Sequence, residues 1–491
     1  MRVTRRRQVI VLGAGVGGLS AAIYARLLGH DVLVLDASPV AGGKAASVEM
    51  SGYRFDPGPS IIILTDIYEQ LFRDAGRKMS DYLEFQRLNP ISRVFHDGTS
   101  SFDLPSDREQ CVRTVKSIAP ADVEAFEKLF VKLDRVAPLV KKSIFSHAYD
   151  QPWQLIDPSL LAMGTLFDVR RTYRELIDGW FSSDLLKAFF YGFPSYGGQS
   201  YDSKAPGALL IPYLMIEEGV YYPKGGVAAI PQSFETLARE LGVEFRFNSR
   251  VRGLRTNGRR VFGVELKDGE VIEGDVVISN VDRLTTRAWL GRQENVAPSF
   301  SYYTLQWGMK SRLSGLSHHN LVIPKEFQHG FHELYHNRRF PVPPIVYLNE
   351  TSGLDPTVVP SGGSNLFAVV TTPSMEPQID WRGDASAYRQ KVIDQVRSVG
   401  IDFEESDIAV ERVQSPTYFE EAHGNYKGSL YGPDERHRLM GGAFPLRNWD
   451  EEFQNLFYCG GSVQPGAGLP MVTLSGKFAV QAMQRRAVSE Q

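Results

Sequence analysis

The amino-terminal part of the chain alternates between short apolar runs and a helical stretch. The runs at 9–12 and 32–35 are apolar throughout, as is typical of buried parallel strands. The stretch 19–28 between them has a helix-forming composition. Strand, helix and strand in this order predict a βαβ unit, and therefore an α/β fold with a parallel sheet.

The hydropathy pattern changes several times after this unit. Short alternating strands are predicted in 82–104, and helices rich in large apolar side chains such as Phe189 and Phe193 in 105–215. The pattern then returns to a helix and buried strands, followed by isolated strands with long loops. It ends in 457–483 with a strand, a glycine-rich loop and a helix. A dinucleotide domain that resumes after long insertions would give this order.

The order of the segments predicts three regions. We assign residues 1–80, 222–285 and 452–491 to a dinucleotide-binding domain, residues 81–104 and 286–451 to a mixed-sheet substrate domain, and residues 105–221 to a helical region. Aromatic helices such as those of the third region most often form an ordinary core. The alternative is that part of them faces lipid or a long apolar tunnel.

Composition limits the class of protein. At 491 residues, with 43% hydrophobic and 23% charged side chains, the chain has room for two or three globular domains. A net charge of −3 gives no reason to expect a nucleic-acid partner. Cys111 and Cys459 fit no disulfide framework or metal site, and we predict small buried side chains. The apolar stretch 208–216 contains Pro212 and is too short to span a bilayer, so we expect only peripheral membrane contact.

The turn between the first strand and the first helix carries a dinucleotide fingerprint. Gly13, Gly15 and Gly18 have the G-x-G-x-x-G spacing, and Asp36 ends the second strand. The first glycine makes a tight turn, the second lets the backbone approach a pyrophosphate, and the third lets helix and strand pack closely. The acid is placed to bind the adenosine ribose. Together these features predict a dinucleotide site.

Two more glycine-rich segments suggest close approach to the same ligand. Asp56-Pro57-Gly58-Pro59 forms a sharp turn, and a loop with Gly466 and Gly468 precedes the last helix. The N-terminus of that helix is suited to a second polar part of the cofactor. A rigid surface turn is the simpler explanation for the Asp56 segment taken alone.

Four blocks, in order along nearly the whole chain, resemble the bacterial carotenoid desaturases of the phytoene desaturase type. They are the amino-terminal fingerprint with Gly42-Gly43-Lys44, then Asp56-x-Gly58-Pro59-Ser60, Tyr222-Pro223-x-Gly225-Gly226 and Gly461-x-x-x-Pro465-Gly466-Ala467-Gly468-x-Pro470. The wider group is similar to the FAD amine-oxidase superfamily. The resemblance implies a Rossmann-like, GR2-like FAD-binding domain, a mixed-sheet substrate domain and a helical, membrane-associating region.

The same resemblance implies non-covalent FAD and the residues that bind it. The expected cofactor-binding residues are Gly13, Gly15, Gly17, Gly18, Asp36, Gly43, Lys44, Gly58, Pro59, Ser60, Val251, Gly461, Gly468, Pro470 and Met471. Among them, Val251 is expected near the adenine, Lys44 near the ribityl side and Gly461 near the isoalloxazine. Many members carry Glu at the Asp36 position. Ser462 stands where several relatives have an acid, and we leave it out of the set.

The predicted chemistry is hydride transfer from an allylic carbon to the flavin while a proton leaves the neighbouring carbon. The aromatic helices and the stretch 207–219 are expected to supply apolar walls. Asp202, Glu217 and Glu218 are candidate general bases that also fit solvated acids, so no catalytic residue is assigned. The adjacent His318-His319 pair is expected to face solvent rather than to bind a metal, and no metal-ligand pattern is present.

The resemblance implies desaturation of a linear carotenoid precursor such as phytoene. Desaturation of a C30 precursor or a hydroxylated carotenoid, a carotenoid isomerase or saturase, and a non-catalytic prenyl-lipid escort are the alternatives. A soluble amine oxidase is disfavoured by the terminal PGAGLP block and by the lack of an obvious aromatic cage. Because only one dinucleotide fingerprint is present, we expect oxygen or a quinone as electron acceptor. The expected location is cytoplasmic, peripheral to the cell membrane.

Overall fold

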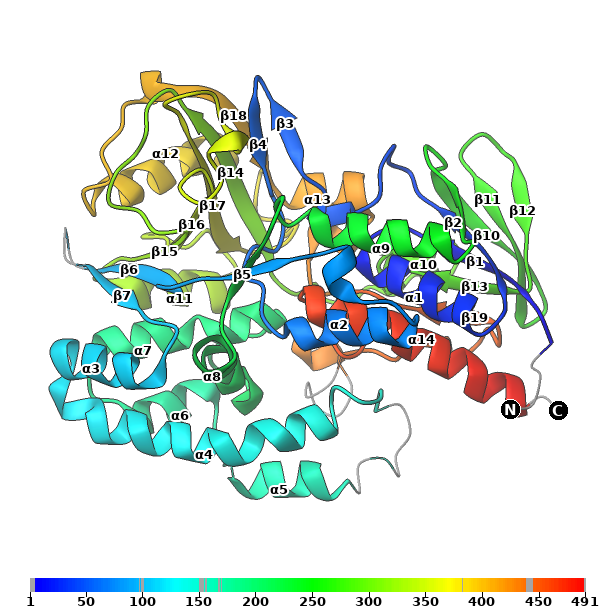
Figure 1. The fold of residues 1–491 in the computed structure, drawn as a ribbon, viewed down its shortest axis with the longest axis horizontal. Coiled ribbons are helices and arrows are strands. Elements are labelled where there is room, and N and C mark those ends of the chain that lie inside the picture. The colour runs from blue at the N-terminus through cyan, green and yellow to red at the C-terminus, as the bar shows by residue number, and fades with distance from the viewer. Residues whose placement is uncertain are drawn as a thin grey trace.

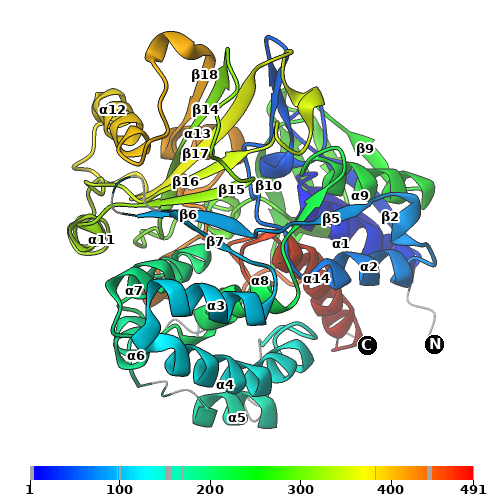
Figure 2. The same ribbon diagram turned by 60° about the vertical axis from the view of Figure 1, so that its left-hand side comes forward.

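The computed structural model describes residues 5–96, 98, 101–149, 154, 157–166, 168, 170–381, 383–438 and 445–489. Two sheets lie side by side, and a group of helices lies below the larger one (Figures 1 and 2). In the view of Figure 1 the smaller sheet and both chain ends are on the right, and the larger sheet is at the upper left.

The smaller sheet is parallel and has five strands. Its order is β19 (Leu456–Tyr458), β13 (Val276–Ser279), β1 (Gln8–Leu12), β2 (Asp31–Leu35) and β9 (Glu244–Arg246). These strands come from the three segments that the sequence assigned to the dinucleotide domain; the exact domain boundaries stay a prediction. Residues 9–12 of the central strand are apolar and buried, with Val9, Ile10 and Val11 at 0% exposure, which explains why they show no alternation with polar residues.

Helices cover one face of this sheet and a small antiparallel sheet covers the other. The helices that share a core with β1 are α1 (Val16–Leu27), α2 (Thr65–Asp74), α9 (Ala229–Glu240) and α14 (Leu469–Ser489). On the opposite face, Ile10 and Leu12 pack with the sheet of β10 (Val251–Asn257), β11 (Arg260–Leu266) and β12 (Val271–Glu273). Helix α1 begins three residues before the predicted Leu19, so that Gly17 and Gly18 lie within it.

The larger sheet has seven strands and is mixed. Its order is β18 (Ile408–Gln414), β14 (Ser301–Met309), β17 (Ser364–Thr372), β16 (Val346–Glu350), β15 (His319–Ile323), β6 (Ser92–His96) and β7 (Ser101–Leu104). Strands β15 and β6 pair in parallel, and the other neighbours are antiparallel. One face packs on α12 (Asp384–Arg397) through residues such as Trp307, Leu348 and Val392. Alternate residues on the other face are therefore free to line a site.

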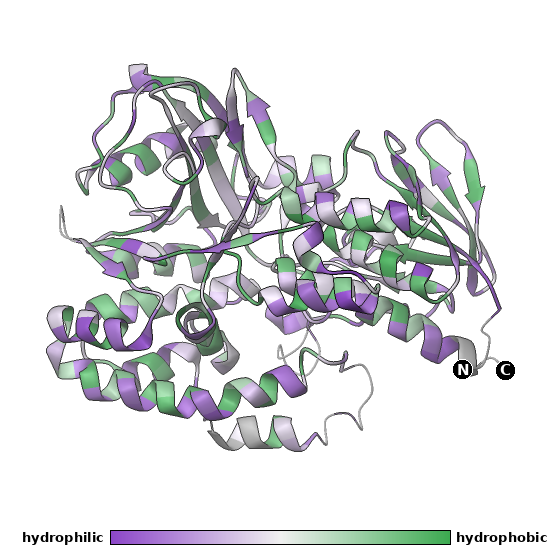
Figure 3. Ribbon diagram, viewed as in Figure 1, coloured by the Kyte–Doolittle hydropathy of each residue, from purple (hydrophilic) through white to green (hydrophobic). Residues whose placement is uncertain are grey.

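The third region is a cluster of helices with its own apolar core. It contains α3 (Arg108–Ile118), α4 (Val123–Lys142), α5 (Pro158–Leu166), α6 (Tyr173–Trp180), α7 (Asp184–Tyr191) and α8 (Leu210–Glu217). Apolar and polar residues alternate along α3 and α4 (Figure 3), and Phe126, Phe130 and Leu133 of α4 are buried in this core. Within the described residues, no helix combines the length and apolarity needed to cross a bilayer.

The remaining described strands and helices connect these regions. Strands β3 (Val48–Met50) and β4 (Tyr53–Phe55) form one hairpin, and β5 (Phe85–Arg87) pairs with β8 (Tyr221–Pro223). The last helices are α10 (Arg283–Ala288), α11 (Phe327–Tyr335) and α13 (Pro416–His423). Cys111 and Cys459 are both free and buried, which confirms the prediction of small buried side chains.

Candidate functional site

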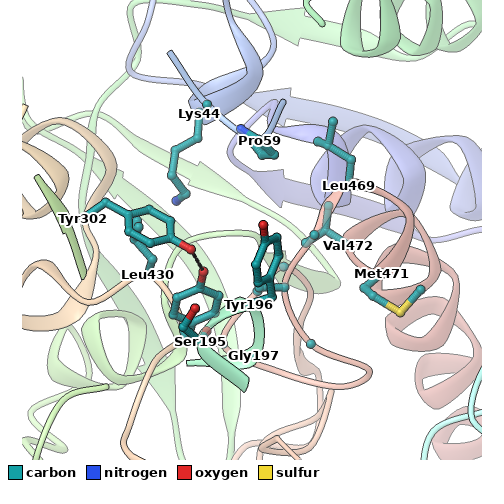
Figure 4. A pocket seen from close by; sticks show the side chains of 18 of the residues that line it. Lys44, Pro59, Ser195, Tyr196, Gly197, Tyr302, Leu430, Leu469, Met471 and Val472 are labelled. Atoms are coloured by element: carbon teal, nitrogen blue, oxygen red, sulfur yellow. Dashed lines mark hydrogen bonds between the residues drawn. The ribbon is translucent and has the colours of Figure 1, made fainter. Parts of the chain in front are cut away.

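A single large cavity is lined by all three regions. Its volume is about 1260 Å³, more than most small-molecule pockets occupy. We call the part lined by the glycine turns, Asp36 and Lys44 the dinucleotide end, and the part lined by residues of α4, α7 and α8 the apolar end. Figure 4 shows the cavity between these parts, with Lys44 and Pro59 on one side and Leu469 and Val472 of α14 on another.

The fingerprint glycines lie where side chains would clash. A Cβ on Gly15 would lie 2.7 Å from Asn280 Nδ2, and one on Gly17 would lie 2.7 Å from Asn280 Oδ1. A Cβ on Gly18 would lie only 2.0 Å from the carbonyl oxygen of Gly13, so this glycine is required for helix–strand packing. Gly13, Gly15 and Gly17 line the cavity, whereas Gly18 does not. Gly15 caps α1 without any side-chain hydrogen bond, which leaves the helix N-terminus available to an anion.

Asp36 presents a carboxylate at the carboxyl end of β2. Its Oδ2 accepts a hydrogen bond from the Ala14 amide at 2.6 Å, and its Oδ1 accepts one from the Ser38 amide at 2.7 Å. Burial raises the pKa of this acid, while the two amides and the nearby Arg250 oppose the rise. The side chain lines the cavity with Val251, the residue predicted near the adenine. A carboxylate fixed by backbone amides is well suited to accept hydrogen bonds from ribose hydroxyls.

Lys44 and Asp282 face each other across the dinucleotide end. Lys44 lines the cavity, and its Nζ donates a hydrogen bond to Asn425 Oδ1 at 3.0 Å. Burial lowers the pKa of Lys44 to about 8, and burial raises the pKa of Asp282 to about 6. Oδ2 of Asp282 is buried without a partner among the described residues. The buried strand that ends near Asn280 was predicted, but the roles of Asn280 and Asp282 were missed.

Two motifs that lie far apart in the sequence hold each other in place. Asp56 Oδ2 accepts a hydrogen bond from the Val227 amide at 2.9 Å, and a Cβ on Gly226 would lie 2.7 Å from the same oxygen. Gly226 also has φ +89°, so the turn strongly favours glycine here. A Cβ on Gly58 would lie 1.9 Å from the Lys44 carbonyl oxygen. The Asp56 turn is thus an internal contact, and Gly58, Pro59 and Ser60 line the cavity.

The carboxy-terminal block lies against the amino-terminal one. A Cβ on Gly476 of α14 would lie 2.5 Å from the Gly17 carbonyl oxygen, so α1 and α14 are in close contact. The loop before α14 contains Gly466 and Gly468 with φ +131° and +101°. The cavity-lining residues of this block include Gly461, Ser462, Gly468, Pro470 and Met471. Of the predicted cofactor residues, all except Gly18 therefore line one cavity; their contacts with the cofactor stay a prediction.

The apolar end is formed by side chains of the helical region and of the larger sheet. The helical residues on the cavity wall include Val136, Val140, Ile144, Phe145, Phe189, Phe193, Ile211 and Leu214, and the 207–219 stretch contributes as predicted. Among the described cavity-lining residues the only carboxylates are Asp36 and Asp282, whereas Lys204 and Arg438 add positive charge elsewhere on the wall. A long apolar ligand fits this wall better than an ammonium ion does.

Sequence reasoning missed a group of cavity-lining tyrosines. Tyr302 and Tyr431 join their hydroxyl oxygens at 2.5 Å, with the rings at 88° to each other, and Tyr196 lies beside them (Figure 4). Tyr335 and Tyr347 also line the cavity. The aromatic cluster was not visible in the sequence because its members come from different strands and loops. Within this cluster, the rings of Tyr302 and Tyr431 are perpendicular to each other rather than parallel.

The three candidate general bases are excluded from the site by their positions. None of them lines the cavity. Asp202 pairs with Arg174 at 2.9 Å and His336 at 3.0 Å. Glu217 pairs with Arg108 at 2.5 Å, and Glu218 pairs with Lys141 at 2.7 Å. All three acids are held in ion pairs outside the cavity.

The prediction that His318 and His319 face solvent is wrong. Their exposures are 8% and 1%, because β15 lies inside the sheet between β6 and β16. The two rings lie close together, with their centroids 4.4 Å apart. Among the described residues, no group of three or more His, Cys, Asp or Glu side chains is placed to hold a metal ion.

Comparison with known proteins agrees with this geometry. Residues 16–484 match the family described as flavin containing amine oxidoreductase. The chain is 32% identical over 496 aligned residues to the zeta-carotene-forming phytoene desaturase of Myxococcus xanthus, covering 98% of this chain and 94% of the relative. It is 30% identical to the 4,4'-diaponeurosporene oxygenase of Staphylococcus haemolyticus, covering 96% of each.

A solved structure supports the fold independently. An oxidoreductase from Methanosarcina mazei superposes with a TM-score of 0.64 at 14% identity, covering 96% of this chain and 100% of that one. At this identity the likeness concerns the fold alone. The family match, in contrast, extends over most of the chain, from residue 16 to residue 484. The chain therefore belongs to the flavin-containing amine oxidoreductase family and, within it, to the group of the bacterial phytoene desaturases.

Proposed function

We propose that this protein is an FAD-dependent desaturase of a linear carotenoid precursor such as phytoene. The observation that carries the proposal is the single cavity that joins a dinucleotide turn to an apolar wall. An enzyme that oxidises a hydrocarbon needs both parts in contact. The reactive edge of the cofactor must meet the hydrocarbon chain, and only an apolar wall can hold that chain in place. The named relatives, a phytoene desaturase and a diaponeurosporene oxygenase, act on compounds of this class.

The residues present fit FAD. The helix N-terminus at Gly15, where a Cβ would clash with Asn280, leaves room for a pyrophosphate against the backbone. The carboxylate of Asp36 is held by two amides for the ribose. The unpartnered Oδ2 of Asp282 and the cation of Lys44 lie where a polar ribityl chain would give both a partner.

When bound, FAD supplies the two-electron oxidant that accepts hydride from an allylic carbon. The chain's own residues bind and orient the polyene. Phe189, Phe193 and Ile211 remove it from water, and the cavity face of the larger sheet holds it opposite the dinucleotide end. Each desaturation removes two hydrogens, so the product mass separates this reaction from isomerisation.

Purified protein reconstituted with FAD provides the test. Mixed without oxygen with phytoene in phosphatidylcholine vesicles, the yellow protein should bleach and yield a product that has lost hydrogen in pairs. A protein that binds FAD but neither bleaches nor changes the mass of phytoene would contradict the proposal. A chain that stays colourless after reconstitution would instead favour a non-catalytic lipid escort.

A second substrate follows from the staphylococcal relative. The name of that relative refers to 4,4'-diaponeurosporene, and the apolar lining has no feature that fixes the length of the polyene. The same bleaching assay with a C30 precursor measures this preference. The substrate with the larger kcat/KM then identifies the natural substrate class.

We also propose a peripheral position on the cytoplasmic face of the cell membrane, with oxygen or a quinone as electron acceptor. The substrate class supports the first part, because a linear carotene partitions into lipid. The single dinucleotide fingerprint of the sequence supports the second. Vesicle co-sedimentation tests the position. Reoxidation of the bleached protein by oxygen or a soluble quinone, compared with its response to NADPH, tests the acceptor.

A further inference from the structure

A chain of three hydrogen-bonded side chains begins at the cavity wall and leads into the larger sheet. Ser60 Oγ and Tyr347 Oη are 2.6 Å apart, and Tyr347 Oη is 2.6 Å from Nδ1 of His319. Ser60 and Tyr347 line the cavity, whereas His319 lies behind them. Both distances are those of strong hydrogen bonds. The cavity is thus connected to a buried imidazole through one phenol.

Tyr347 carries a polar hydroxyl at a position whose partners in the sheet are apolar. These register partners are Leu321 on β15 and Val369 on β17, and both line the cavity together with Ile345. Binding a hydrocarbon chain needs only an apolar ring here, and phenylalanine would serve. The hydroxyl and its buried partner therefore call for a chemical explanation.

The protonation states of the chain suit proton transfer. Burial holds the pKa of His319 well below its usual range, with His318 adding to the effect, so the imidazole is neutral. Burial raises the pKa of Tyr347, so the phenol keeps its proton. Nε2 of His319 is buried and has no partner among the described residues. With the imidazole proton on Nε2, the phenol donates to Nδ1 and a lone pair on its oxygen stays available.

The carboxylates and the histidine among the described cavity-lining residues are poorly placed for this task. Asp36 and Asp282 belong to the dinucleotide end, where backbone amides bind their carboxylates. His423 lies at the same end, and burial together with the cations of Lys44, Arg412 and Arg250 lowers its pKa to about 3. Among the described tyrosines that line the cavity, Tyr347 is the one whose hydroxyl is hydrogen-bonded to an imidazole, whereas Tyr302 and Tyr431 are hydrogen-bonded to each other.

We propose that Tyr347 is the catalytic residue that receives the proton lost by the polyene, with His319 and Ser60 as positioning residues that act through it. The inference rests on the proposed desaturase function. One C–H bond breaks and its electron pair leaves as hydride to the flavin, which is reduced. The neighbouring C–H bond breaks, its electron pair forms the new C=C bond, and its proton goes to Tyr347 Oη. The phenolic proton passes to Nδ1 of His319 and returns by the same chain after product release.

This reaction does not require a strong base. Loss of hydride from an allylic carbon leaves positive charge, and a C–H bond next to that charge is strongly acidic. A neutral phenol backed by a neutral imidazole is therefore a sufficient acceptor. Ser60, which hydrogen-bonds the same oxygen, fixes the hydroxyl at the boundary between the dinucleotide end and the apolar end.

Anaerobic bleaching of the FAD-loaded protein by phytoene in phosphatidylcholine vesicles tests the proposal. Tyr347→Phe should slow flavin reduction about 10²- to 10⁴-fold. It should also abolish the slowing in D₂O that we expect for the wild type, because the variant has no exchangeable phenolic proton to transfer. His319→Gln keeps a hydrogen-bond acceptor but cannot hold the proton, and should also slow the reaction. Tyr303→Phe is the matched control: its hydroxyl donates to the Ala385 carbonyl on the far face of the same sheet, and the rate should be unchanged.

A second measurement is independent of turnover. In protein labelled with ¹⁵N-histidine, the His319 Nδ1 resonance, assigned by its loss in His319→Gln, should shift in Tyr347→Phe and not in Tyr303→Phe. Full bleaching rates in Tyr347→Phe, with FAD bound, would overturn the proposal, as would an unmoved Nδ1 signal. A wild-type protein that does not bleach contradicts the desaturase function instead, while the resonance still reports on the hydrogen bond.

Discussion

The two ends of the cavity are built in different ways. At the dinucleotide end the backbone makes the site: Gly15, Gly17 and Gly58 lie where any side chain would collide with a neighbour. At the apolar end the side chains make the site, and they come from helices and strands that are far apart in the sequence. The first construction tolerates almost no change, whereas the second tolerates substitution as long as volume and apolarity are kept.

The difference has a physical origin. A pyrophosphate is small, charged and rigidly recognised, so the peptide groups must approach it closely and in a fixed direction. A polyene offers only apolar surface, whose burial is non-directional and roughly proportional to area. We therefore expect substitutions at the dinucleotide end to act on folding and cofactor affinity, and those at the apolar end to act on substrate affinity.

The largest effect is expected for Gly18→Ala. The new Cβ would lie 2.0 Å from the Gly13 carbonyl oxygen, and neither backbone segment is able to move without opening the β1–α1 turn. We expect a loss of about 3 kcal/mol or more in the free energy of unfolding, and loss of bound FAD. Thermal melting and the flavin absorbance of the purified protein measure both.

Gly253→Ala is the control for this change. Gly253 lies on β10 with ordinary φ, and the nearest heavy atom to an added Cβ is 3.7 Å away. Its stability should change by less than about 1 kcal/mol. If Gly18→Ala melted at the same temperature as Gly253→Ala and kept its flavin, the view that backbone contacts define this end would be wrong.

Asp36→Ala comes next and separates cofactor affinity from folding. The substitution leaves the Ala14 and Ser38 amides without an acceptor and removes the ribose ligand. We expect FAD affinity of the apoprotein to fall about a hundredfold, since hydrogen bonds to charged groups are worth about 1.5–3 kcal/mol. Titration followed by flavin fluorescence measures it. Asp31→Asn on the same strand, whose partner is the exposed Arg6, should bind FAD normally; equal loss in both variants would refute a specific role for Asp36.

The same contrast explains what sequence reasoning achieved. Helix α1, strands β1 and β2 and the turn at Gly13 were predicted because their signals are local: an apolar run, a glycine spacing and a terminal acid. The meeting of Asp56 with Gly226 was not predicted, although both motifs were recognised, because nothing in either motif specifies the other as its partner.

The residues of the larger sheet were harder to predict for a related reason. Whether Tyr347 faces the cavity depends on its register with Val369 and on which face α12 covers. His319 was misjudged because periodicity does not reveal that β15 is flanked on both sides. The sequence assigned no role to the candidate bases, and it did not reveal that Glu217 meets Arg108, a partner from another helix. Such contacts are properties of the assembled fold.

At the apolar end, Phe189→Ala should produce a smaller and different effect. Phe189 contacts Phe190 and Phe193 and lines the cavity. Without this ring, the bound substrate buries less apolar surface. The KM for phytoene should therefore rise about tenfold, with FAD affinity unchanged. Steady-state desaturation in vesicles measures this. Phe189→Leu, which keeps most of the apolar area, should recover most of the affinity; a loss of flavin in either variant would break the proposed division between the two ends.

The smallest effect concerns Asp282, a buried carboxylate at the dinucleotide end. Burial raises its pKa from 3.8 to about 6, so the folded apoprotein holds a proton over a pH range in which the unfolded chain has released it. The group's contribution to stability is therefore present below about pH 4 and is lost as the pH rises through about 6. Asp282→Asn is neutral throughout and should remove about 2 kcal/mol of this pH-dependent decline between about pH 4 and about pH 7, because one pKa unit corresponds to about 1.4 kcal/mol. Urea unfolding of the apoprotein at about pH 4 and about pH 7 measures the difference, with the exposed turn residue Asp268→Asn as the control. If the wild type and Asp282→Asn declined equally over this range, the carboxylate would have to be solvated, and the dinucleotide end would be open to water rather than enclosed by the protein.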